Sequence, residues 1–592
     1  MEMNIDPEEY SNWDIVKATQ YGILPRCKEL VEGGYDVRSP DAENITLLHW
    51  AAINNRQDIA RYYISAGAVV DVLGGDLMAT PMHWAIREGH LPMVVLLMQY
   101  GADPNVRDAE GCASIHVAVQ CSHSNIVAYL IAKGVDPDLY DANGKTPLMW
   151  ATWRTFGIDP TRMLLSMHAS VNFQDEHQHN TPLHYACMSQ NSNVLMALVN
   201  AGADLEAKNN RGETPLDIAR MKKNVWIISK LTAMRKDKGL DSRMPTFLRG
   251  FNTSQWRKRA ALVTAFFAIF SVGFIFNISS ATWLLKCILL VLAYGFIHVM
   301  AMFCVTQHEM VSTFPICISF ATKFWVYMTS FFFFWPVISS MFAQLLFLIF
   351  TPAMWYFFYK AMMTDPGIIS CQEEQKKRTI IRAAETDSLM IEKFCSTCMV
   401  MKPLRSKHCA VTNKCIAKFD HFCPWVYNTV GAGNHRYFIG YLLFLLGMLT
   451  WNVWASFQYW HVMCAIPKGS TMLEQLTLIP KCSPWVFWIF ANCVFHTVWV
   501  FLLLSCQLYQ IVWLGVTTNE RMNASRYAHF RTSDHGHLEK SPYNRGFLNN
   551  TADFFECSLL GLLRPVIVDW KTKMEFGSEF SDPMKSKIYE TV

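Results

Sequence analysis

Two long stretches of the sequence contain almost no charged side chains, and this feature restricts the possible fold most strongly. Residues 260–360 carry four charges and residues 438–514 carry three. An α-helix needs about 20 apolar residues to cross the roughly 30 Å hydrocarbon core of a bilayer. Six runs of about this length fit the two stretches: residues 260–278, 283–305, 314–336, 339–358, 438–460 and 485–514. We therefore expect six membrane-spanning helices, four before and two after a polar segment over residues 361–437.

The even number of helices in each group predicts which parts of the chain share one side of the membrane. Four spans place residues 1–259 and the polar segment on the same side, and two more return residues 515–592 to it. Basic residues flank the spans on that side, at positions 257–259, 376–378 and 521. Because basic residues are enriched in cytoplasmic loops, we predict that this side, with both termini, is cytosolic.

The first 245 residues are well charged and repeat themselves every 33 to 35 positions. A pattern of the type Thr-Pro-Leu-His-x-Ala recurs six times, beginning at Thr46, Thr80, Ala113, Thr146, Thr181 and Thr214. Threonine caps helices, proline is accepted in the first helical turn, and small alanine lets neighbouring helices approach closely. The pattern resembles the ankyrin repeat, and about seven units would fill residues 13–235. A tail over residues 1–12 and a linker over residues 236–259 would flank them.

The composition excludes several broad classes of protein. The 592-residue chain is 52% hydrophobic and 17% charged, and its net charge is +4. It is too long for one core and too apolar for an ordinary soluble protein, in which about 25% of residues are charged. The small net charge disfavours nucleic acid as a partner. Residues 1–6 contain no basic or apolar run, so no signal peptide is expected.

The polar segment concentrates cysteine and histidine at spacings typical of metal sites. It contains, in order, Cys395, Cys398, His408, Cys409, Cys415 and the sequence Asp420-His421-Phe422-Cys423. In a reducing cytosol, such spacing favours zinc over disulfides.

The polar segment resembles the cysteine-rich domain of the DHHC protein S-acyltransferases. The whole chain resembles their ankyrin-repeat branch, the huntingtin-interacting palmitoyltransferases, and the resemblance includes Asp365-Pro-Gly367, Thr517-Thr-Asn-Glu520 and Asn550. It implies an all-α fold, in which an ankyrin-repeat solenoid precedes a six-helix transmembrane bundle with a cytosolic zinc-binding cysteine-rich domain. It also implies that Asp365 and Glu520 organise the cytosolic face.

The resemblance further implies two zinc sites, each with three cysteines and one histidine. The first maps onto Cys395, Cys398, His408 and Cys415, which together make a tetrahedral site feasible. The second would join Cys409 to three positions that here hold Thr412, Phe422 and Thr429. One cysteine cannot hold a structural zinc, so we predict one zinc ion per chain. The lobe without zinc is expected to be held by packing of Phe422, Trp425 and Tyr427.

The same resemblance implies the catalytic residues. Cys423 would be the nucleophile, His421 the general base and acid, and Asp420 the residue that orients His421. Phe422 alters the signature to DHFC, but it replaces a zinc ligand and leaves these three residues in place. Cys423 would attack an acyl-CoA such as palmitoyl-CoA, and a client cysteine would then accept the acyl group in a ping-pong reaction.

A long acyl chain needs an apolar environment, which the spans would supply as a cavity with Cys423 at its cytosolic rim. Burial of the chain contributes about 0.8 kcal/mol per methylene. Candidates for binding the phosphates of coenzyme A are Lys402, Arg405, Lys407 and Arg436. Each of them is also compatible with a solvated or headgroup-facing charge.

Ankyrin stacks present a concave surface that binds other proteins. Trp50, Trp84 and Trp150 precede the repeated alanine, where they either pack within the stack or line a groove. The resemblance implies that the groove binds short Val/Ile- and Pro-containing motifs in disordered clients, through Asn54 and Trp84. It also implies a location in the Golgi or another endomembrane.

Two other functions are compatible with the sequence. The chain could be a membrane scaffold whose acyltransferase lobe has decayed; the lost zinc ligands favour this, and the retained Asp420, His421 and Cys423 oppose it. A transporter is a weaker alternative, since His298 and His496 lie within spans. Of the eighteen cysteines, thirteen have no assigned role and are expected to be reduced.

Overall fold

The computed structural model describes residues 10–153, 160–237, 254–278, 282–304, 313–386, 389, 394–395, 397–464, 471–527, 530, 541–558 and 564–573. Contacts divide the chain into two units. The first joins Met1–Asp241 to Ser370–Met401, and the second joins Ser242–Ile369 to Lys402–Val592. Most of the expected N-terminal tail and linker lie outside the described residues, as do position 305 and residues 574–592.

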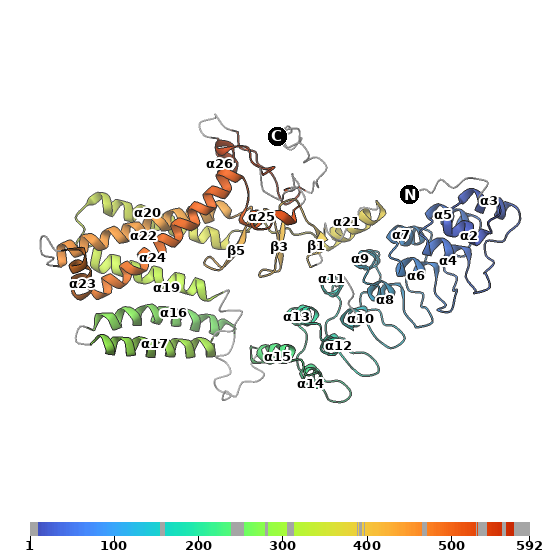
Figure 1. Cartoon of the computed structure of the whole chain (residues 1–592), viewed down its shortest axis with the longest axis horizontal. Helices are drawn as coiled ribbons and strands as arrows, with labels where there is room; N and C mark the ends of the chain where they lie inside the picture. The colour runs from blue at the N-terminus through green and yellow to red at the C-terminus, as the bar shows by residue number, and fades with distance from the viewer. Residues whose placement is uncertain are drawn as a thin grey trace. The chain divides into compact units, whose positions relative to one another are not determined.

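Short helices stack in pairs through the N-terminal part of the first unit (Figure 1). The described residues contain seven such pairs: α2 (Ile15–Tyr21), α3 (Leu24–Glu32), α4 (Leu47–Ile53), α5 (Gln57–Ser65), α6 (Pro81–Arg87), α7 (Leu91–Gln99), α8 (Ser114–Gln120), α9 (Ser124–Ala132), α10 (Pro147–Trp153), α11 (Thr161–Ser166), α12 (Pro182–Ser189), α13 (Ser192–Asn200), α14 (Pro215–Met221) and α15 (Val225–Asp237). These pairs form the expected helical solenoid.

The repeated histidine explains why neighbouring repeats stay in register. In the repeat that begins at Thr46, the backbone N–H of Thr46 donates to Nδ1 of His49, which closes the first turn of α4. The other ring nitrogen of His49 donates to the carbonyl of Ala79, in the turn of the next repeat, at 2.9 Å. Since His49 is fully buried, each such bond fixes one repeat on the next.

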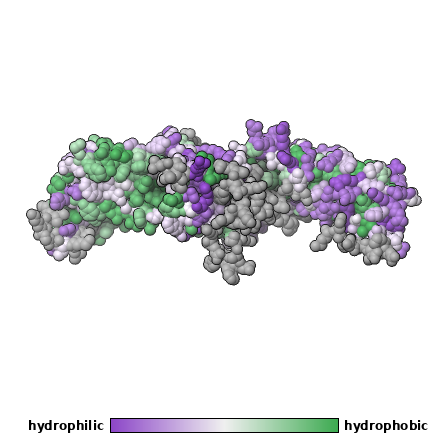
Figure 2. All heavy atoms as spheres, turned by 90° about the horizontal axis from the view of Figure 1, so that it is seen from above, coloured by the Kyte–Doolittle hydropathy of each residue, from purple (hydrophilic) through white to green (hydrophobic). Residues whose placement is uncertain are grey.

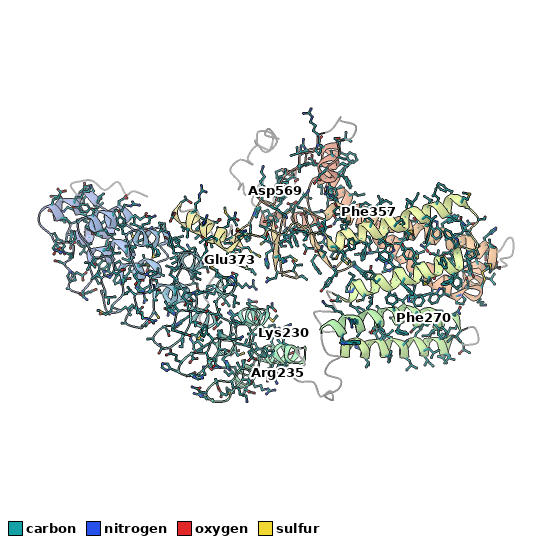
Figure 3. All side chains as sticks on the ribbon, turned by 180° about the vertical axis from the view of Figure 1, so that it is seen from behind. Lys230, Arg235, Phe270, Phe357, Glu373 and Asp569 are labelled. Carbon is teal, nitrogen blue, oxygen red and sulfur yellow. A yellow bond between two sulfur atoms is a disulfide. The ribbon has the colours of Figure 1, made fainter. Side chains whose placement is uncertain are left out.

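One helix from the polar segment belongs to the same unit as the repeats. Helix α21 (Glu373–Glu385; Glu373 is labelled in Figure 3) buries Ile380 and Ala384 in the hydrophobic cluster of the repeat helices. Its last residue, Glu385, forms an ion pair of 3.1 Å with Lys133, which directly follows α9. The repeats therefore anchor the segment that leads into Cys395.

Long apolar helices make up most of the second unit, and hydrophobic residues cover much of its surface (Figure 2). Five of the described helices are long and apolar enough to cross a membrane: Lys258–Asn277, Phe314–Phe334, Met341–Met363, His435–Met463 and Pro484–Leu514. They correspond to α16 (Ser254–Asn277), α19 (Phe314–Thr329) with the π-helical η2 (Ser330–Phe334), α20 (Met341–Met363), α22 (His435–Met463), and α24 (Pro484–Leu508) with the π-helical η4 (Tyr509–Leu514). The chain is thus a membrane protein.

The other expected span coincides with α17 (Trp283–Cys304). Its described apolar stretch, Leu284–Val299, is shorter than those of the other five helices. The count of six spans therefore stays a prediction.

Glycines on α22 allow it to pack closely against α20. A side chain at Gly440 would collide with Phe357 (labelled in Figure 3), and one at Gly447 would lie 3.0 Å from Phe350. Phe357 also stacks on Phe444, with ring centroids 5.4 Å apart. Small residues that admit large ones are a common way for membrane helices to associate.

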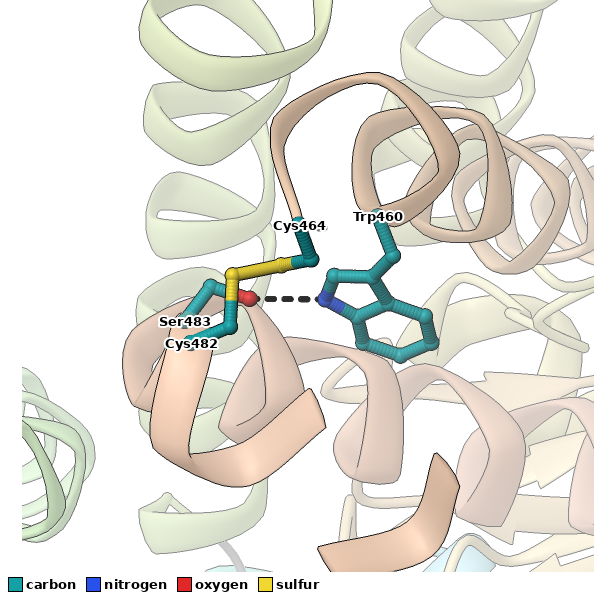
Figure 4. Close-up of a disulfide and its surroundings, with 4 residues drawn as sticks. All are labelled: Trp460, Cys464, Cys482 and Ser483. Carbon is teal, nitrogen blue, oxygen red and sulfur yellow. Dashed lines mark hydrogen bonds between the residues drawn. A yellow bond between two sulfur atoms is a disulfide. The ribbon is translucent and has the colours of Figure 1, made fainter. Parts of the chain in front are cut away.

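A disulfide joins Cys464 to Cys482 in the loop between α22 and α24 (Figure 4). The loop contains α23 (Met472–Cys482), and the indole of Trp460 donates to the hydroxyl of Ser483 beside the disulfide, at 2.7 Å. The expectation that these two cysteines are reduced is wrong. Sequence spacing gave no signal, because the two residues meet only when the loop folds back between the two helices.

The cysteine-rich segment is built from three two-stranded antiparallel hairpins. They pair β1 (Phe394–Cys395) with β2 (Val400–Met401), β3 (Lys407–Cys409) with β4 (Lys414–Ile416), and β5 (His421–Cys423) with β6 (Asn428–Val430). The all-α prediction is therefore wrong for this segment. Ligands that are close in the sequence require tight turns. A short hairpin pairs the backbone N–H and C=O groups on both sides of such a turn, which a helix cannot do. The short helices α25 (Thr518–Met522) and η5 (Ala524–Arg526) follow η4, and α26 (Phe547–Phe555) lies further along the chain.

Candidate active site

The β5–β6 hairpin places two of the predicted catalytic side chains on one face. Successive residues of a strand point to opposite faces, so His421 and Cys423 share a face and Phe422 points to the other. Cys423 pairs with Asn428, and it is 5% exposed. Phe422, which makes the signature DHFC, therefore lies on the face of the strand opposite to His421 and Cys423.

Asp420 orients His421 through a short hydrogen bond. Nδ1 of His421 donates to Oδ2 of Asp420 at 2.6 Å, which leaves the other ring nitrogen for Cys423. The backbone N–H of Thr518 donates to Oδ1 of Asp420 at 2.6 Å, and Nε2 of Gln507 donates to Oδ2 at 3.2 Å. Because Asp420 is only 1% exposed, these donors are what make its buried charge tolerable.

These contacts shift the pKa values of both residues. Burial alone would raise the pKa of Asp420, but the nearby His435 and the bonds from His421 and Thr518 hold it well below its ordinary range. Burial alone would lower the pKa of His421, but its interactions with Asp420 and Cys423 raise it to about 10. At neutral pH, His421 is therefore an imidazolium beside the Cys423 sulfur. It holds a proton before any substrate arrives.

Two asparagines fasten this hairpin to the end of a membrane helix. The side-chain amide of Asn428 donates to the carbonyls of Ala361, Met362 and Thr364 at 2.9–3.1 Å. Asn434 also donates to the carbonyl of Ala361, at 3.1 Å. These carbonyls lack helical partners because α20 ends at Met363. The asparagines thus cap α20 and hold Cys423 at the end of the bundle.

A largely apolar cavity opens between the membrane helices at Cys423. It encloses about 810 Å³ of empty space. Helices α19, α20, α22 and α24 supply its walls, and Phe438, Leu445, Met448 and Val500 are among the apolar residues that line it. The cavity brings a nucleophilic sulfur into contact with space suited to a hydrocarbon chain.

The four predicted zinc ligands form a cluster. Cys395 ends β1 and Cys398 lies in the turn before β2, and His408 lies directly opposite Cys415 in the β3–β4 hairpin. Their ligand atoms all lie within 4.8 Å of one another. Three thiolates and one imidazole at this separation fit the tetrahedral coordination of a structural zinc ion.

Comparisons with known proteins agree with this arrangement. Residues 388–525 match the family model of the DHHC palmitoyltransferase, and residues 15–108, 106–175 and 156–241 match that of ankyrin repeats. The chain is 55% identical over 568 residues to Palmitoyltransferase ZDHHC17 of Homo sapiens, covering 95% of this chain and 89% of that protein. The chain belongs to the palmitoyltransferase family. It is also 44% identical over 583 residues to Palmitoyltransferase Hip14 of Drosophila melanogaster, covering 97% and 90% of the two chains.

In this palmitoyltransferase, apolar packing fills the lobe that lacks zinc ligands. Phe422 packs against buried Cys409, Ile416 and Phe419, and the hydroxyl of Thr429 donates to the Cys409 sulfur at 3.4 Å. The expectation for Phe422 agrees with this packing.

The expectation that Trp425 and Tyr427 hold the same lobe is wrong. Trp425 packs with the cluster of the membrane helices, and Tyr427 is 41% exposed. The turn between β5 and β6 directs both residues away from the lobe.

The structure also corrects one candidate for binding coenzyme A. Nε and Nη2 of Arg405 each donate to the Glu520 carboxylate at 2.6 Å, and the Arg405 side chain is 4% exposed. Arg405 therefore holds the cysteine-rich segment to the chain after η4 and cannot reach a phosphate in solvent. Lys407 donates to Asn519 at 2.6 Å, whereas Arg436 pairs with Glu556 near the surface.

Sequence reasoning missed two residues of this palmitoyltransferase's site. Gln507 donates to Asp420 and accepts from His435, and Thr518 donates its backbone N–H and its hydroxyl to Asp420. For Gln507, the available signal was a glutamine within an apolar span, because uncompensated polar groups are costly inside a membrane. Thr518 lies in a motif that the sequence shows, but only the fold reveals its partner.

The two residues predicted to bind clients lie in neighbouring repeats and share one neighbour. The side-chain amide of Asn54 donates to the carbonyl of Trp50 at 2.9 Å. The Trp84 ring meets the Trp50 ring edge-on, with centroids 6.1 Å apart. The Trp50 indole donates to Asp41 at 2.9 Å, and the Trp150 indole donates to Asp141 at the same distance. These tryptophans are half-buried, so they both pack and present ring surface.

Proposed function

We propose that this membrane protein is a protein S-palmitoyltransferase that works through an acyl-enzyme on Cys423. It would transfer a long-chain acyl group from acyl-CoA to cysteines of client proteins that its ankyrin repeats recruit. The observation that carries the proposal is the placement of Cys423 beside an Asp420–His421 pair and at an apolar cavity of about 810 Å³. A soluble thiol hydrolase would not need such a cavity among membrane helices.

The reaction follows from the charges at the site. The Cys423 thiolate attacks the thioester carbonyl, the bond from carbon to the coenzyme A sulfur breaks, and His421 gives its proton to the departing sulfur. Neutral His421 then takes the proton of a client cysteine. That thiolate attacks the acyl-enzyme, and the Cys423 thiolate is released beside a re-protonated His421.

Asp420 supports both transfers. It keeps the Nδ1 proton of His421 in place, so that the other ring nitrogen always faces the reacting sulfurs. It also stabilises the imidazolium form to which the cycle returns.

A single zinc ion would be held by Cys395, Cys398, His408 and Cys415. With four protein ligands such a site is closed, so the ion supplies structure. The lobe around Phe422, Cys409 and Thr429 would be held without metal by the packing described above.

Loading of the purified protein with an alkyne-tagged palmitoyl-CoA tests the proposal. We expect wild type to form a hydroxylamine-sensitive thioester and Cys423→Ser to lose it, because Cys423 is the sulfur that interacts with His421. Cys409→Ser is the control, since Cys409 faces the Phe422 lobe. If wild type and Cys423→Ser label equally poorly, the chain is a membrane scaffold that binds clients through its repeats. That result would contradict the enzymatic proposal.

We propose that the repeats raise the local concentration of client cysteines at Cys423. Binding of a short motif at Asn54 and Trp84 would tether the rest of a disordered client, which turns the second acyl transfer into an intramolecular encounter. Helix α21, anchored on the repeats by Ile380 and Ala384, supports such a link because it leads into the cysteine-rich segment.

We propose that the catalytic hairpin and both termini are cytosolic and that the protein resides in the Golgi or another endomembrane. The disulfide supports this orientation. Helix α22 begins five residues after β6 and ends at Met463, so Cys464 lies at the opposite end of this span from Cys423. Disulfides persist in oxidising compartments such as the lumen of the secretory pathway. Cys423 is then on the reducing side.

Sealed microsomes with their cytosolic face outward test the orientation. A membrane-impermeant maleimide polymer should leave Cys464 and Cys482 unmodified until detergent and a reductant are both present. In matched samples of the Cys464→Ser/Cys482→Ser protein, modification at these two sites should be missing, which identifies them. Modification of both cysteines in intact, unreduced microsomes would place the loop in the cytosol and contradict the proposed topology.

A further inference from the structure

A lysine lies inside the membrane-spanning bundle and lines the same cavity as Cys423. Lys323 is on α19, it is 7% exposed, and Ser319, Tyr441 and Phe438 line the cavity with it. Ionisable residues within membrane spans are costly and usually mark a functional site. The reaction steps above give Lys323 no role.

Neutral groups hold the Lys323 ammonium in place. Its Nζ donates to the hydroxyl of Ser319, one turn earlier, and to the Ser319 carbonyl at 3.4 Å. The same nitrogen lies 4.6 Å from the ring centroid of Phe358 and 5.4 Å from that of Tyr441. Aromatic faces attract cations, and more strongly away from water. The ammonium is thus fixed at the cavity wall.

No carboxylate pairs with this cation among the described residues that line the cavity. Their other polar side chains are Ser319, Thr322, Tyr327, Tyr441, Asn452 and His496, in addition to Cys423 and the indoles. The negative charge that the reaction brings to this cavity is the Cys423 thiolate and then the thioester oxygen. Tyr441 lines the same cavity as both Ser319 and Cys423.

We propose that Lys323 is a positioning residue for acyl transfer, whose buried positive charge stabilises the negative charge that forms at Cys423 and on the thioester oxygen. The role rests on the proposed Cys423 acyl-enzyme. A cation fixed in a medium of low dielectric acts over longer distances than one in water. It also needs no rearrangement when the charge develops.

Other titratable groups face the same space. His421 on β5 and Tyr441 on α22 lie beside Cys423, and Asp420 acts through His421. His496 on α24 interacts with Lys323, and Tyr327 is one turn further along α19. The described α20 residues that line the cavity contribute Met354, which does not titrate. Lys323 is the amine among these groups, so its replacement by an uncharged residue tests its charge directly.

Lys323→Met preserves the length of the side chain and removes its charge. We expect acyl-enzyme formation from palmitoyl-CoA to slow by about 10- to 100-fold in kcat, with KM not raised. Alkylation of Cys423 by iodoacetamide, followed by mass spectrometry of its peptide, should slow at pH 7, and its pH profile should move to higher pH. Lys323→Arg should recover part of both rates.

Lys360→Met is the matched control, because Lys360 also lies near two tyrosine rings, Tyr356 and Tyr437, but outside the cavity. It should keep the wild-type pH profile. A wild-type profile and loading rate in a folded Lys323→Met protein would overturn the proposal, and so would faster loading with an unchanged profile. The alkylation profile tests Lys323 even if wild type fails to load, whereas loading of wild type tests the acyl-enzyme itself.

Discussion

Asp420→Asn is expected to lower the rate of acyl-enzyme formation by about 10³-fold or more, measured as thioester labelling with alkyne-palmitoyl-CoA. The substitution removes the charge that stabilises the His421 imidazolium. It also places an amide N–H₂ among groups that all donate to this side chain, namely His421, Thr518 and Gln507. The imidazole then loses both its orientation and its proton.

The pH dependence distinguishes this cause from simple misfolding. The pKa of His421 is raised to about 10. Its imidazolium therefore stabilises the folded protein fully below the ordinary pKa of about 6.5, and this stabilisation is lost as the pH rises through about 10. The pKa of Asp420 is lowered, so its carboxylate stabilises the folded protein above about pH 4, and this stabilisation is lost as the pH falls further. Because His421 stays protonated until the pH approaches about 10, wild-type loading should be flat from about pH 7 to 9, whereas loading by Asp420→Asn should decline above about pH 6.5, the ordinary pKa of histidine.

Asp365→Asn is the control for this experiment. Asp365 lies after the end of α20 and accepts from the backbone N–H groups of Gly367 and Ile368 at 2.9 and 2.7 Å. The described partners of Asp365 are Gly367, Ile368 and Lys571, which lie outside the Asp420–His421 pair, so Asp365→Asn should leave the pH profile unchanged. An Asp420→Asn protein with near-wild-type rates would contradict the role of Asp420.

Cys415→Ser is expected to reduce zinc from one ion per chain to none and to destabilise the cysteine-rich segment. Structural zinc sites contribute about 10 kcal/mol or more to folding in small domains, and Cys415 is fully buried opposite His408. Metal analysis of the purified protein and its thermal unfolding measure the two effects. Loading activity should be lost as well, because β3 and β4 support the strand that carries Cys423.

Cys409→Ser should retain one zinc ion per chain. Cys409 follows the ligand His408 in the sequence, but it points to the opposite face of β3, where it meets Thr429 and Phe422. Two zinc ions per wild-type chain, or loss of the ion in Cys409→Ser, would contradict the single-site assignment.

Periodicity and ligand spacing predicted much of the fold and the candidate site. The repeat of Thr-Pro-Leu-His-x-Ala indicates a helical solenoid, because threonine caps a helix, proline occupies its first turn and alanine allows close packing within each repeat. The spacing of cysteine and histidine indicated zinc, and the resemblance to the DHHC acyltransferases assigned Cys395, Cys398, His408 and Cys415 as its ligands. The Cys464–Cys482 disulfide and the Gln507–Asp420 bond join residues that are distant in the sequence, and no local pattern encodes such pairs.

The sequence by itself determined that this chain has apolar helices for a membrane and a stack of repeats, because these depend on local periodicity and composition. Its resemblance to the DHHC acyltransferases predicted the Asp-His-x-Cys set. Only the tertiary structure decided how the set works. It buried Asp420 among Thr518 and Gln507, turned Phe422 away from Cys423, and withdrew Arg405 into an ion pair with Glu520. It also brought Lys323 into the cavity that Cys423 lines. Burial and distance set the charge of each group, and both arise only when distant segments pack together.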